Sequence, residues 1–244
     1  MEASSISNAG GATLASAVAE SRRRGDRALD EPTGKSILAA YGVTVPRSRV
    51  VVQRDEAAGR AAELCPPYVL KVVSAAVLHK SDVGGVKVGL RTPDDVAREL
   101  KAMANALELQ GIHAAQWLVE EMAPSGLEFV IGGVVDPEFG PMVMAGLGGV
   151  FVEVMGDVAF RICPIDRADA LEMLDELRGA ALLRGVRGGK PVDVDAIVDV
   201  LLRVAGEDGL LMASAEDIAE VDINPLIVSD KGAVAVDARF ILRA

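Results

Sequence analysis

Residues 68–90 read YVLKVVSAAVLHKSDVGGVKVGL, with two β-branched apolar runs on either side of a polar segment. Each run carries a lysine, and the polar segment holds a histidine and a Gly-Gly pair. This pattern predicts a strand, a loop and a second strand. Glycine amides can approach phosphate oxygens, and lysine ammonium groups can neutralise the phosphate charge. The stretch therefore predicts a nucleotide site.

Strand-like and helix-like segments alternate on both sides of this stretch. Strands are expected at 49–53, 116–122, 128–135 and 141–147, and helices at 12–27, 35–41, 55–64, 93–109, 166–176 and 194–207. Alternation of this kind, in a chain that is 50% apolar and 3% aromatic, predicts the α/β (α+β) class. We expect a lead with one helix at 1–32, a first lobe at 33–115 and a second lobe at 116–244. The first eleven residues are expected to be disordered.

Charge and composition exclude several classes of protein. The formal net charge of −11 argues against a nucleic-acid partner, because phosphate backbones are bound by clustered positive charge. The sequence has no uninterrupted apolar run of roughly 18 residues, so no membrane partner is expected. The N-terminus lacks the basic and apolar regions of a signal peptide, and Cys65 and Cys163 are solitary. These features predict a cytoplasmic protein with reduced thiols.

The C-terminal part of the sequence predicts a hairpin that carries oxygen ligands. Its two strands are expected at 220–228 and 233–238, and the SDKG between them is typical of a tight turn. If the turn is centred between Asp230 and Lys231, Asn224 lies directly across from Asp237. Facing Cβ atoms are about 4.5–5.5 Å apart, which lets both side chains reach one Mg²⁺. Asp222 lies on the same face. From spacing alone, a solvent-facing polar side of an edge hairpin is the favoured interpretation.

Five short motifs follow one another along the chain. They are LKVVS at 70–74 with HKSDVGGV at 79–86, EEM at 120–122 with Glu128, GLGGVFVE at 146–153, RG at 187–188, and DINPL at 222–226. Jointly they resemble the ATP-grasp (beta) subunit or domain of ADP-forming acetyl-CoA synthetases, from about residue 33 to the C-terminus. The resemblance implies an ATP-grasp fold, in which two α/β lobes clamp a nucleotide.

The resemblance also implies an activity, with ATP or ADP and Mg²⁺ as cofactors. In this family an acyl-CoA and inorganic phosphate give an acyl phosphate, and a histidine of the alpha subunit takes the phosphoryl group. The grasp subunit then passes that group to ADP, and the reaction is reversible. The implied partner is a CoA-binding alpha subunit, which holds most of the acyl-CoA or acid substrate. The chain is thus expected to be one subunit of an ADP-forming acetate–CoA ligase.

The resemblance assigns phosphate handling to the opening stretch. Lys71 is expected to contact the nucleotide phosphates, and the turn of Gly84, Gly85 and Val86 to close over them. His79 matches a position that carries phosphate transiently within the grasp subunit. A neutral imidazole is nucleophilic, and phosphohistidine passes its phosphoryl group on readily. Without the resemblance, Lys71 would be taken for a surface lysine with a buried stem.

Four further positions match residues that bind the adenosine portion. Glu120 and Glu128 correspond to adenosine-binding glutamates, and the backbone of Val119 and Met122 is expected to face the adenine. On their own, the two glutamates would be interpreted as solvated strand ends.

The hairpin residues match the metal ligands and a catalytic acid. Asn224 and Asp237 correspond to Mg²⁺ ligands, in agreement with the register argument, and Asp222 corresponds to an acid that faces the incoming phosphohistidine. Two other functions remain open: a different ATP-grasp carboxylate ligase, and a non-catalytic nucleotide-sensing subunit. The His79 loop argues against the first, because such ligases need no histidine relay.

Overall fold

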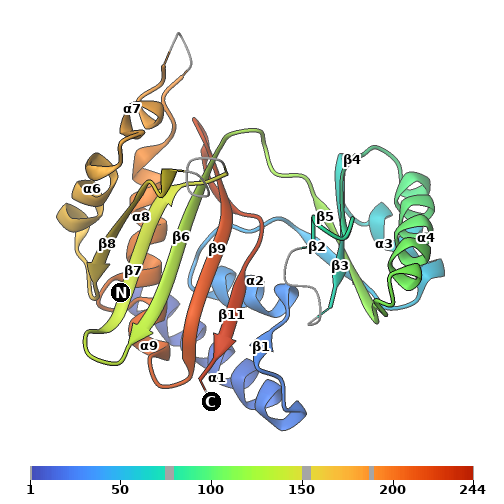
Figure 1. Ribbon diagram of the computed structural model, residues 1–244, viewed down its shortest axis with the longest axis horizontal. Helices are drawn as coiled ribbons and strands as arrows, with labels where there is room; N and C mark the ends of the chain where they lie inside the picture. Colours follow the sequence, from blue (N-terminus) through green and yellow to red (C-terminus); the bar gives the residue numbers. More distant parts are fainter. Residues whose placement is uncertain (1, 75–79, 150–154, 187–189, 244) are drawn as a thin grey trace. The chain divides into compact units, whose positions relative to one another are not determined.

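The chain folds into two compact units, each with its own sheet and core (Figure 1). The computed structural model describes residues 2–74, 80–149, 155–186 and 190–243, and side chains from residue 9 onward. Unit 1 comprises Met1–Val45 and Pro124–Ala244, and unit 2 comprises Pro46–Ala123. The boundaries thus differ from those predicted at residues 33 and 116, because the N-terminal segment and the start of the expected first lobe pack with the C-terminal part of the chain.

Unit 2 contains the predicted strand–loop–strand in a four-stranded antiparallel sheet of order β2-β5-β3-β4. The strands are β2 (Ser48–Val51), β3 (Tyr68–Val73), β4 (Val86–Leu90) and β5 (Gln116–Glu121). The 3₁₀ turn η1 (Arg54–Glu56) and the helices α3 (Ala57–Ala62) and α4 (Pro93–Leu109) complete the unit. Leu70, Val72 and Val119 on one face of the sheet are buried in a core with Leu100 and Leu107 of α4. The other face of this sheet carries Lys71.

Helix α4 has the bounds predicted from its sequence, because both its cap and its apolar stripe are encoded locally. Thr92 and Asp95 form a capping box: the Asp95 amide donates to Thr92 Oγ1 at 3.1 Å, and the Thr92 amide donates to Asp95 Oδ2 at 3.0 Å. Val96, Leu100 and Met103 are spaced by three and four residues and are buried on the side that faces the sheet.

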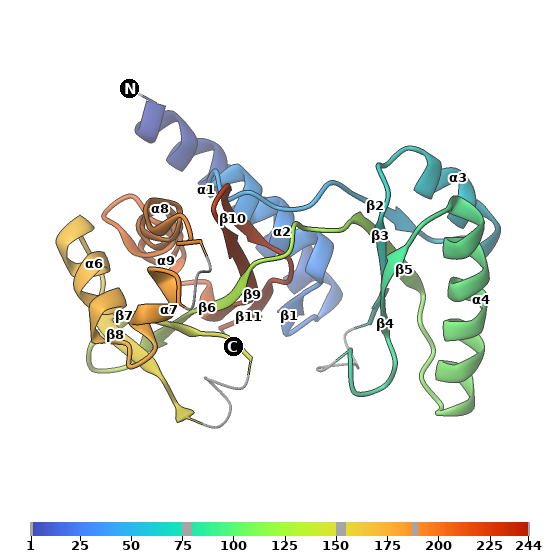
Figure 2. The same ribbon diagram turned by 90° about the horizontal axis from the view of Figure 1, so that it is seen from above.

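Unit 1 is built on a seven-stranded sheet with the strand order β1-β11-β9-β6-β7-β8, in which β10 also pairs with β9. The strands are β1 (Ala28–Leu29), β6 (Leu127–Asp136), β7 (Gly140–Leu147), β8 (Val158–Ile162), β9 (Ile218–Ser229), β10 (Gly232–Ala235) and β11 (Arg239–Leu242). The helices are α1 (Glu2–Arg24), α2 (Glu31–Ala40), α6 (Arg167–Glu176), α7 (Ala180–Leu183), α8 (Val194–Ala205) and α9 (Leu210–Ser214). In Figure 2, α6, α8 and α9 gather on one side of the strands β6 to β9.

Side-chain alternation assigns each face of this sheet. Phe129 and Ile131 of β6 are buried in the core with Val143 of β7 and Ile223 of β9, on the side of the helices. The residues between them point to the opposite face, which we call the open face. Gly132 of β6 lies on the open face and pairs with Asp222 of β9. This places Asp222, a predicted catalytic residue, on the open face.

The N-terminal segment is more ordered than its sequence suggests. The prediction that residues 1–11 are disordered is wrong, because α1 begins at Glu2. Alanine favours helix, and the buried side chains of Leu14 and Val18 join this helix to the core of unit 1. The N-cap of α2 is Asp30, whose carboxylate accepts the Thr33 amide at 2.9 Å. No helix in the described ranges is long and apolar enough to cross a membrane.

Candidate functional site

Two of the predicted nucleotide-binding side chains meet in unit 2. Lys71 of β3 pairs with Leu118 of β5, so Lys71 and Glu120 point to the same face of the sheet, away from α3 and α4. Lys71 Nζ lies 2.9 Å from Glu120 Oε2, and the two side chains are only 7% and 2% exposed. A charge-assisted contact at this depth holds the ammonium group in one place. Lys71 is therefore a fixed cation rather than a mobile surface lysine.

The Gly-Gly pair is required by the turn that precedes β4. Gly84 has a φ of +72°, which a residue with a side chain rarely adopts. A Cβ at Gly85 would lie 2.5 Å from Val72 Cγ1, so only glycine lets the turn pack against β3. The Gly85 amide donates to Lys80 O at 2.6 Å and the Gly84 amide to Ser81 O at 3.1 Å. In this conformation both amides donate hydrogen bonds within the turn, and the expected closure of the turn over the phosphates stays a prediction. Val86 follows as the first residue of β4, paired with Lys71.

The two backbone positions expected near adenine differ in their surroundings. Val119 has a buried side chain, and its backbone lies inside the sheet between Arg49 of β2 and Leu70 of β3. The Val119 side chain thus belongs to the core of unit 2, and the expected contact of its backbone with adenine stays a prediction. Met122 follows the last residue of β5, and its side chain is 43% exposed. The Met122 amide donates to Pro67 O at 2.8 Å.

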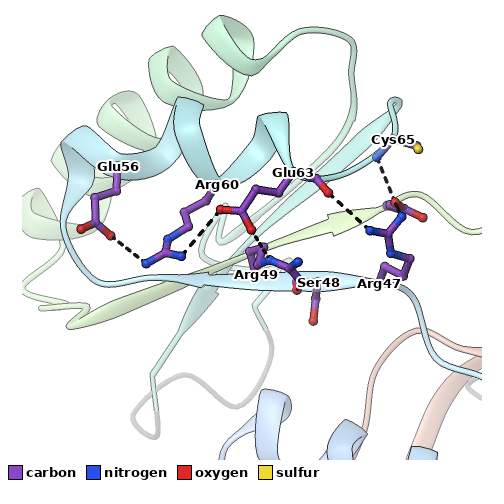
Figure 3. A network of polar contacts seen from close by, with 8 residues as sticks. Arg47, Ser48, Arg49, Glu56, Arg60, Glu63 and Cys65 are labelled. Carbon is purple, nitrogen blue, oxygen red and sulfur yellow. Dashed lines mark hydrogen bonds and ion pairs between the residues drawn. The ribbon is translucent and has the colours of Figure 1, made fainter.

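A network of polar contacts fixes the end of β5 next to Glu120 (Figure 3). Arg47 Nη1 lies 2.9 Å from Glu121 Oε1, and the Cys65 amide donates to the same oxygen at 2.9 Å. Arg49 of β2 contacts Glu63 at 2.6 Å through its Nε. Ion pairs that are as exposed as these contribute little to the free energy of unfolding. Their role is geometric, because they tie β2 and the segment after α3 to the strand end where the predicted nucleotide residues lie.

In unit 1, the glycine-rich motif at 146–149 packs on Glu128. The Gly148 amide donates to Glu128 O at 2.8 Å, and a Cβ at Gly148 would lie 3.0 Å from Glu128 Cβ. Gly149 has a φ of +61°. The two glycines thus allow the chain to turn against Glu128, whose side chain is exposed at the start of β6. The rest of this motif, at 150–153, lies outside the described residues.

The predicted register of the C-terminal hairpin is confirmed on both sides of the candidate metal ligands. In β10, Ala235 pairs with Leu226 of β9, and in β11, Arg239 pairs with Asp222. Both pairs have the same offset, so the three residues between them face one another in the same order, and Asn224 faces Asp237. The predicted second strand is too long, because β10 ends at Ala235 and the chain then pairs again as β11, which the sequence analysis missed.

A β-bulge lies at the candidate metal ligand Asn224. Strand β9 has two residues, Asn224 and Pro225, at the place where the neighbouring strand β6 has one, Val130. Ile223 and Leu226 on either side of the bulge are both fully buried. The extra residue leaves Asn224 exposed without removing either neighbour from the core. Bulges commonly redirect a side chain next to a functional site in this way.

The donors at this place fit a hard divalent cation. Asn224 and Asp237 offer an amide oxygen and a carboxylate oxygen, and Asp222 adds a second carboxylate on the open face. Across the described part of the chain, no group of three or more His, Cys, Asp or Glu side chains is placed to hold a metal. Mg²⁺ is usually held by one or two protein oxygens together with water and substrate phosphates. The residues present therefore suit Mg²⁺ better than a metal held entirely by protein.

Two residues complete the comparison with the sequence predictions. His79 lies outside the described residues, so its proposed relay role stays a prediction. Arg239 was missed: it faces Asp222 across β9 and β11, and its Nη2 lies 3.9 Å from Glu220 Oε1. The sequence signal was weak, because β11 has four residues and no typical turn separates it from β10.

The ATP-grasp domain family matches residues 20–242 of the sequence. The beta subunit of ADP-forming acetate–CoA ligase I from Pyrococcus furiosus is 39% identical over 227 residues, which span 92% of this chain and 96% of that protein. The chain belongs to this ATP-grasp family. ADP-forming acetate–CoA ligase I of Archaeoglobus fulgidus is 41% identical over 215 residues, which span 86% of this ATP-grasp chain and 30% of that longer protein.

A solved structure confirms the predicted ATP-grasp fold. Acetyl-coenzyme A synthetase 1 of Candidatus Korarchaeum cryptofilum matches with a TM-score of 0.81 and 42% sequence identity, covering 93% of this ATP-grasp chain and 99% of that chain. That structure contains coenzyme A and Mg-AMPPCP, and its phosphohistidine segment points towards the nucleotide-binding site.

Proposed function

We propose that this chain is the nucleotide-binding subunit of an ADP-forming acyl-CoA synthetase of the cytoplasm. In this role it passes a phosphoryl group between a phosphohistidine and ADP, with Mg²⁺. The observation that carries the proposal is the similarity to an acetate–CoA ligase beta subunit over 96% of that subunit. The strand register around the candidate metal ligands supports the proposal. The pairs Ala235–Leu226 and Arg239–Asp222 have the same offset, which brings the oxygen ligands Asn224 and Asp237 to one face.

The phosphoryl transfer needs positioning and neutralisation of charge more than covalent help from the protein. In each of the two transfers the nitrogen–phosphorus bond of a phosphohistidine breaks as the acceptor atom bonds to phosphorus, and the leaving imidazole keeps a proton on its other nitrogen. The acceptor is a ring nitrogen of His79 in the first transfer and a terminal oxygen of ADP in the second. Lys71 supplies a positive charge for the phosphates, and Asp222 accepts a hydrogen bond from the imidazole. Bound Mg²⁺, held by Asn224 and Asp237, would neutralise the phosphate oxygens.

The partner in this proposal is a CoA-binding alpha subunit that binds the acyl-CoA or acid substrate and carries the first phosphohistidine. His79 acts as the relay on this chain, taking the phosphoryl group on a ring nitrogen and giving it to ADP. Each transfer conserves the phosphoryl group, so one acyl phosphate yields one ATP.

The test is the complete reaction with purified components. The chain, its CoA-binding subunit, acetyl-CoA, inorganic phosphate, Mg²⁺ and labelled ADP are incubated, and labelled ATP is measured. We expect labelled ATP only when both subunits are present. Labelled ATP that is absent with both subunits, under conditions where the chain binds ADP, would overturn the proposal.

The same experiment separates two other functions. A nucleotide-sensing subunit would bind labelled ADP without forming labelled ATP. A different ATP-grasp carboxylate ligase would consume ATP only when an acid and an amine are supplied together. Neither alternative is favoured by a specific feature of the described residues.

A further inference from the structure

The open face of the unit 1 sheet has an apolar part as well as the polar part that carries Asp222. Its apolar side chains come from β6, β7 and β8 and are Val134, Met142, Met144, Phe160 and Ile162, which we call the apolar half-face. Phe160 is 55% exposed, Ile162 52% and Val134 45%. Large apolar side chains that gather in this way on a protein surface mark interaction sites.

The apolar half-face and Asp222 belong to the same rows of the sheet. Phe160 pairs with Met144, Met144 with Gly132, and Gly132 with Asp222. With neighbouring strands about 4.8 Å apart, Phe160 lies about 14 Å from Asp222 along this row. A Cβ at Gly132 would lie 3.1 Å from Met144 Cε, so the Met144 side chain covers Gly132 where the apolar part meets the acidic part.

The neighbouring row repeats the arrangement. Ile162 pairs with Met142, Met142 with Val134, and Val134 with Glu220 of β9. Both rows thus run from exposed apolar side chains on β8 to an acidic side chain on β9. Arg239 of β11 lies opposite Asp222, and its Nη2 lies 3.9 Å from Glu220 Oε1, so the acidic part already has a cation beside it. A partner that covers both parts needs an apolar surface beside a polar or histidine-bearing segment.

Strand β8 reverses the usual orientation of polar and apolar side chains. Arg161, between Phe160 and Ile162, points to the helix side, where its Nη1 lies 3.1 Å from Glu176 Oε2 of α6. The charged residue of this edge strand is therefore bound within unit 1, while its two largest apolar residues face outward. An ordinary solvent-facing strand would place these residues the other way round.

We propose that the apolar half-face docks the CoA-binding subunit, and that this contact guides its phosphohistidine segment to Asp222. The inference rests on the proposed function and adds the surface and the chemistry of the contact. A group delivered to Asp222 by a separate subunit needs a binding surface that continues from Asp222, and the apolar half-face does so within the same rows. The acidic side chains of Glu220 and Asp222 then meet the histidine segment.

The test uses the double variant Phe160→Ser/Ile162→Ser, with Leu171→Ser as the matched control. Leu171 is 38% exposed on α6, on the helix side of the same sheet. We expect the dissociation constant for the purified CoA-binding subunit to rise at least tenfold in the double variant. The control should stay within about twofold of the parent, and both variants should bind Mg-ADP like the parent, which shows that they are folded.

A second variant, Val134→Arg, introduces a charge into the apolar half-face from β6 and should weaken the same complex. Unchanged binding of the CoA-binding subunit by both variants would overturn the inference while leaving the proposed function intact. A double variant that loses self-association but keeps the CoA-binding subunit would assign the surface to a second copy of the chain instead. A parent chain that binds no CoA-binding subunit and forms no ATP would overturn both proposals.

Discussion

Lys71 and Glu120 form a buried ion pair of 2.9 Å between two neighbouring strands of unit 2. We propose both residues as part of the nucleotide site. The lysine that would neutralise phosphate is therefore already held by a carboxylate, and its amine does not have to be ordered when a nucleotide binds. This pre-organisation reduces the entropy lost on binding.

Because the ion pair is buried, removal of either partner should lower the free energy of unfolding strongly. Lys71→Met and Glu120→Gln should each destabilise the protein by about 3–5 kcal/mol, because each leaves a buried charge without its counterion at this contact. The double variant should be less destabilised than the sum of the single variants. Urea unfolding followed by the fluorescence of Trp117, the single tryptophan, reports on β5 directly. Additive effects would show that the two side chains do not depend on each other.

Asp237→Ala should raise the Mg²⁺ concentration needed for half-maximal ATP formation by at least tenfold, since a hard-cation ligand is lost. Asp230→Ala in the turn of the same hairpin is the control, because Asp230 is exposed and its Oδ2 lies 2.8 Å from Lys190 Nζ, away from the candidate metal ligands. The measurement is a Mg²⁺ titration of the two-subunit reaction. An unaltered titration in Asp237→Ala would remove this residue from the metal site.

His79→Ala should lower ATP formation by orders of magnitude while the affinity for Mg-ADP stays nearly unchanged, because the relay transfers phosphate without holding the nucleotide. His113→Ala provides the control, as His113 is the other histidine of the chain and is exposed. Turnover and Mg-ADP binding are measured on the same preparations. Equal turnover of His79→Ala and the parent would exclude the relay.

The environment of Asp95 at the start of α4 predicts that the stability of the fold depends on pH. The Arg98 guanidinium, 2.6 Å away, and the hydrogen bonds of Thr92 lower the pKa of Asp95 from 3.8 to about 2. A depressed carboxylate pKa stabilises the fold above pH 3.8, and this contribution is lost as the pH falls through about 2. Arg98→Ala should move the pKa of Asp95 back towards 3.8 in a titration followed by NMR. A pKa that stays near 2 would assign the shift to Thr92 alone.

Local signals predicted much of the fold. Helix α4 was predicted with its bounds, and Asp94 and Asp95 in its first turn and the buried Val96 and Leu100 show that its start and its buried side are encoded locally. The hairpin register followed from the turn between Asp230 and Lys231. Both depend on residues that are close in the sequence, where turn and cap chemistry is specific.

Long-range pairing explains what was missed. Strand β1 has two residues, and its place is set by pairing with β11 more than two hundred residues later. Strand β8 carries exposed Phe160 and Ile162, which gives it no usual alternation towards the core. The contact of Lys71 with Glu120 depends on which strands become neighbours in the sheet. No short window of sequence contains this information.

The bulge at Asn224 and Pro225 puts the two parts of β9 out of phase with each other. Ile223 is in phase with the core when read from the start of the strand, and Leu226 when read from its end. Deletion of one bulge residue would turn every side chain on one side of it to the opposite face of the sheet. The extra residue therefore keeps both flanking parts of β9 in the core while Asn224 between them is exposed.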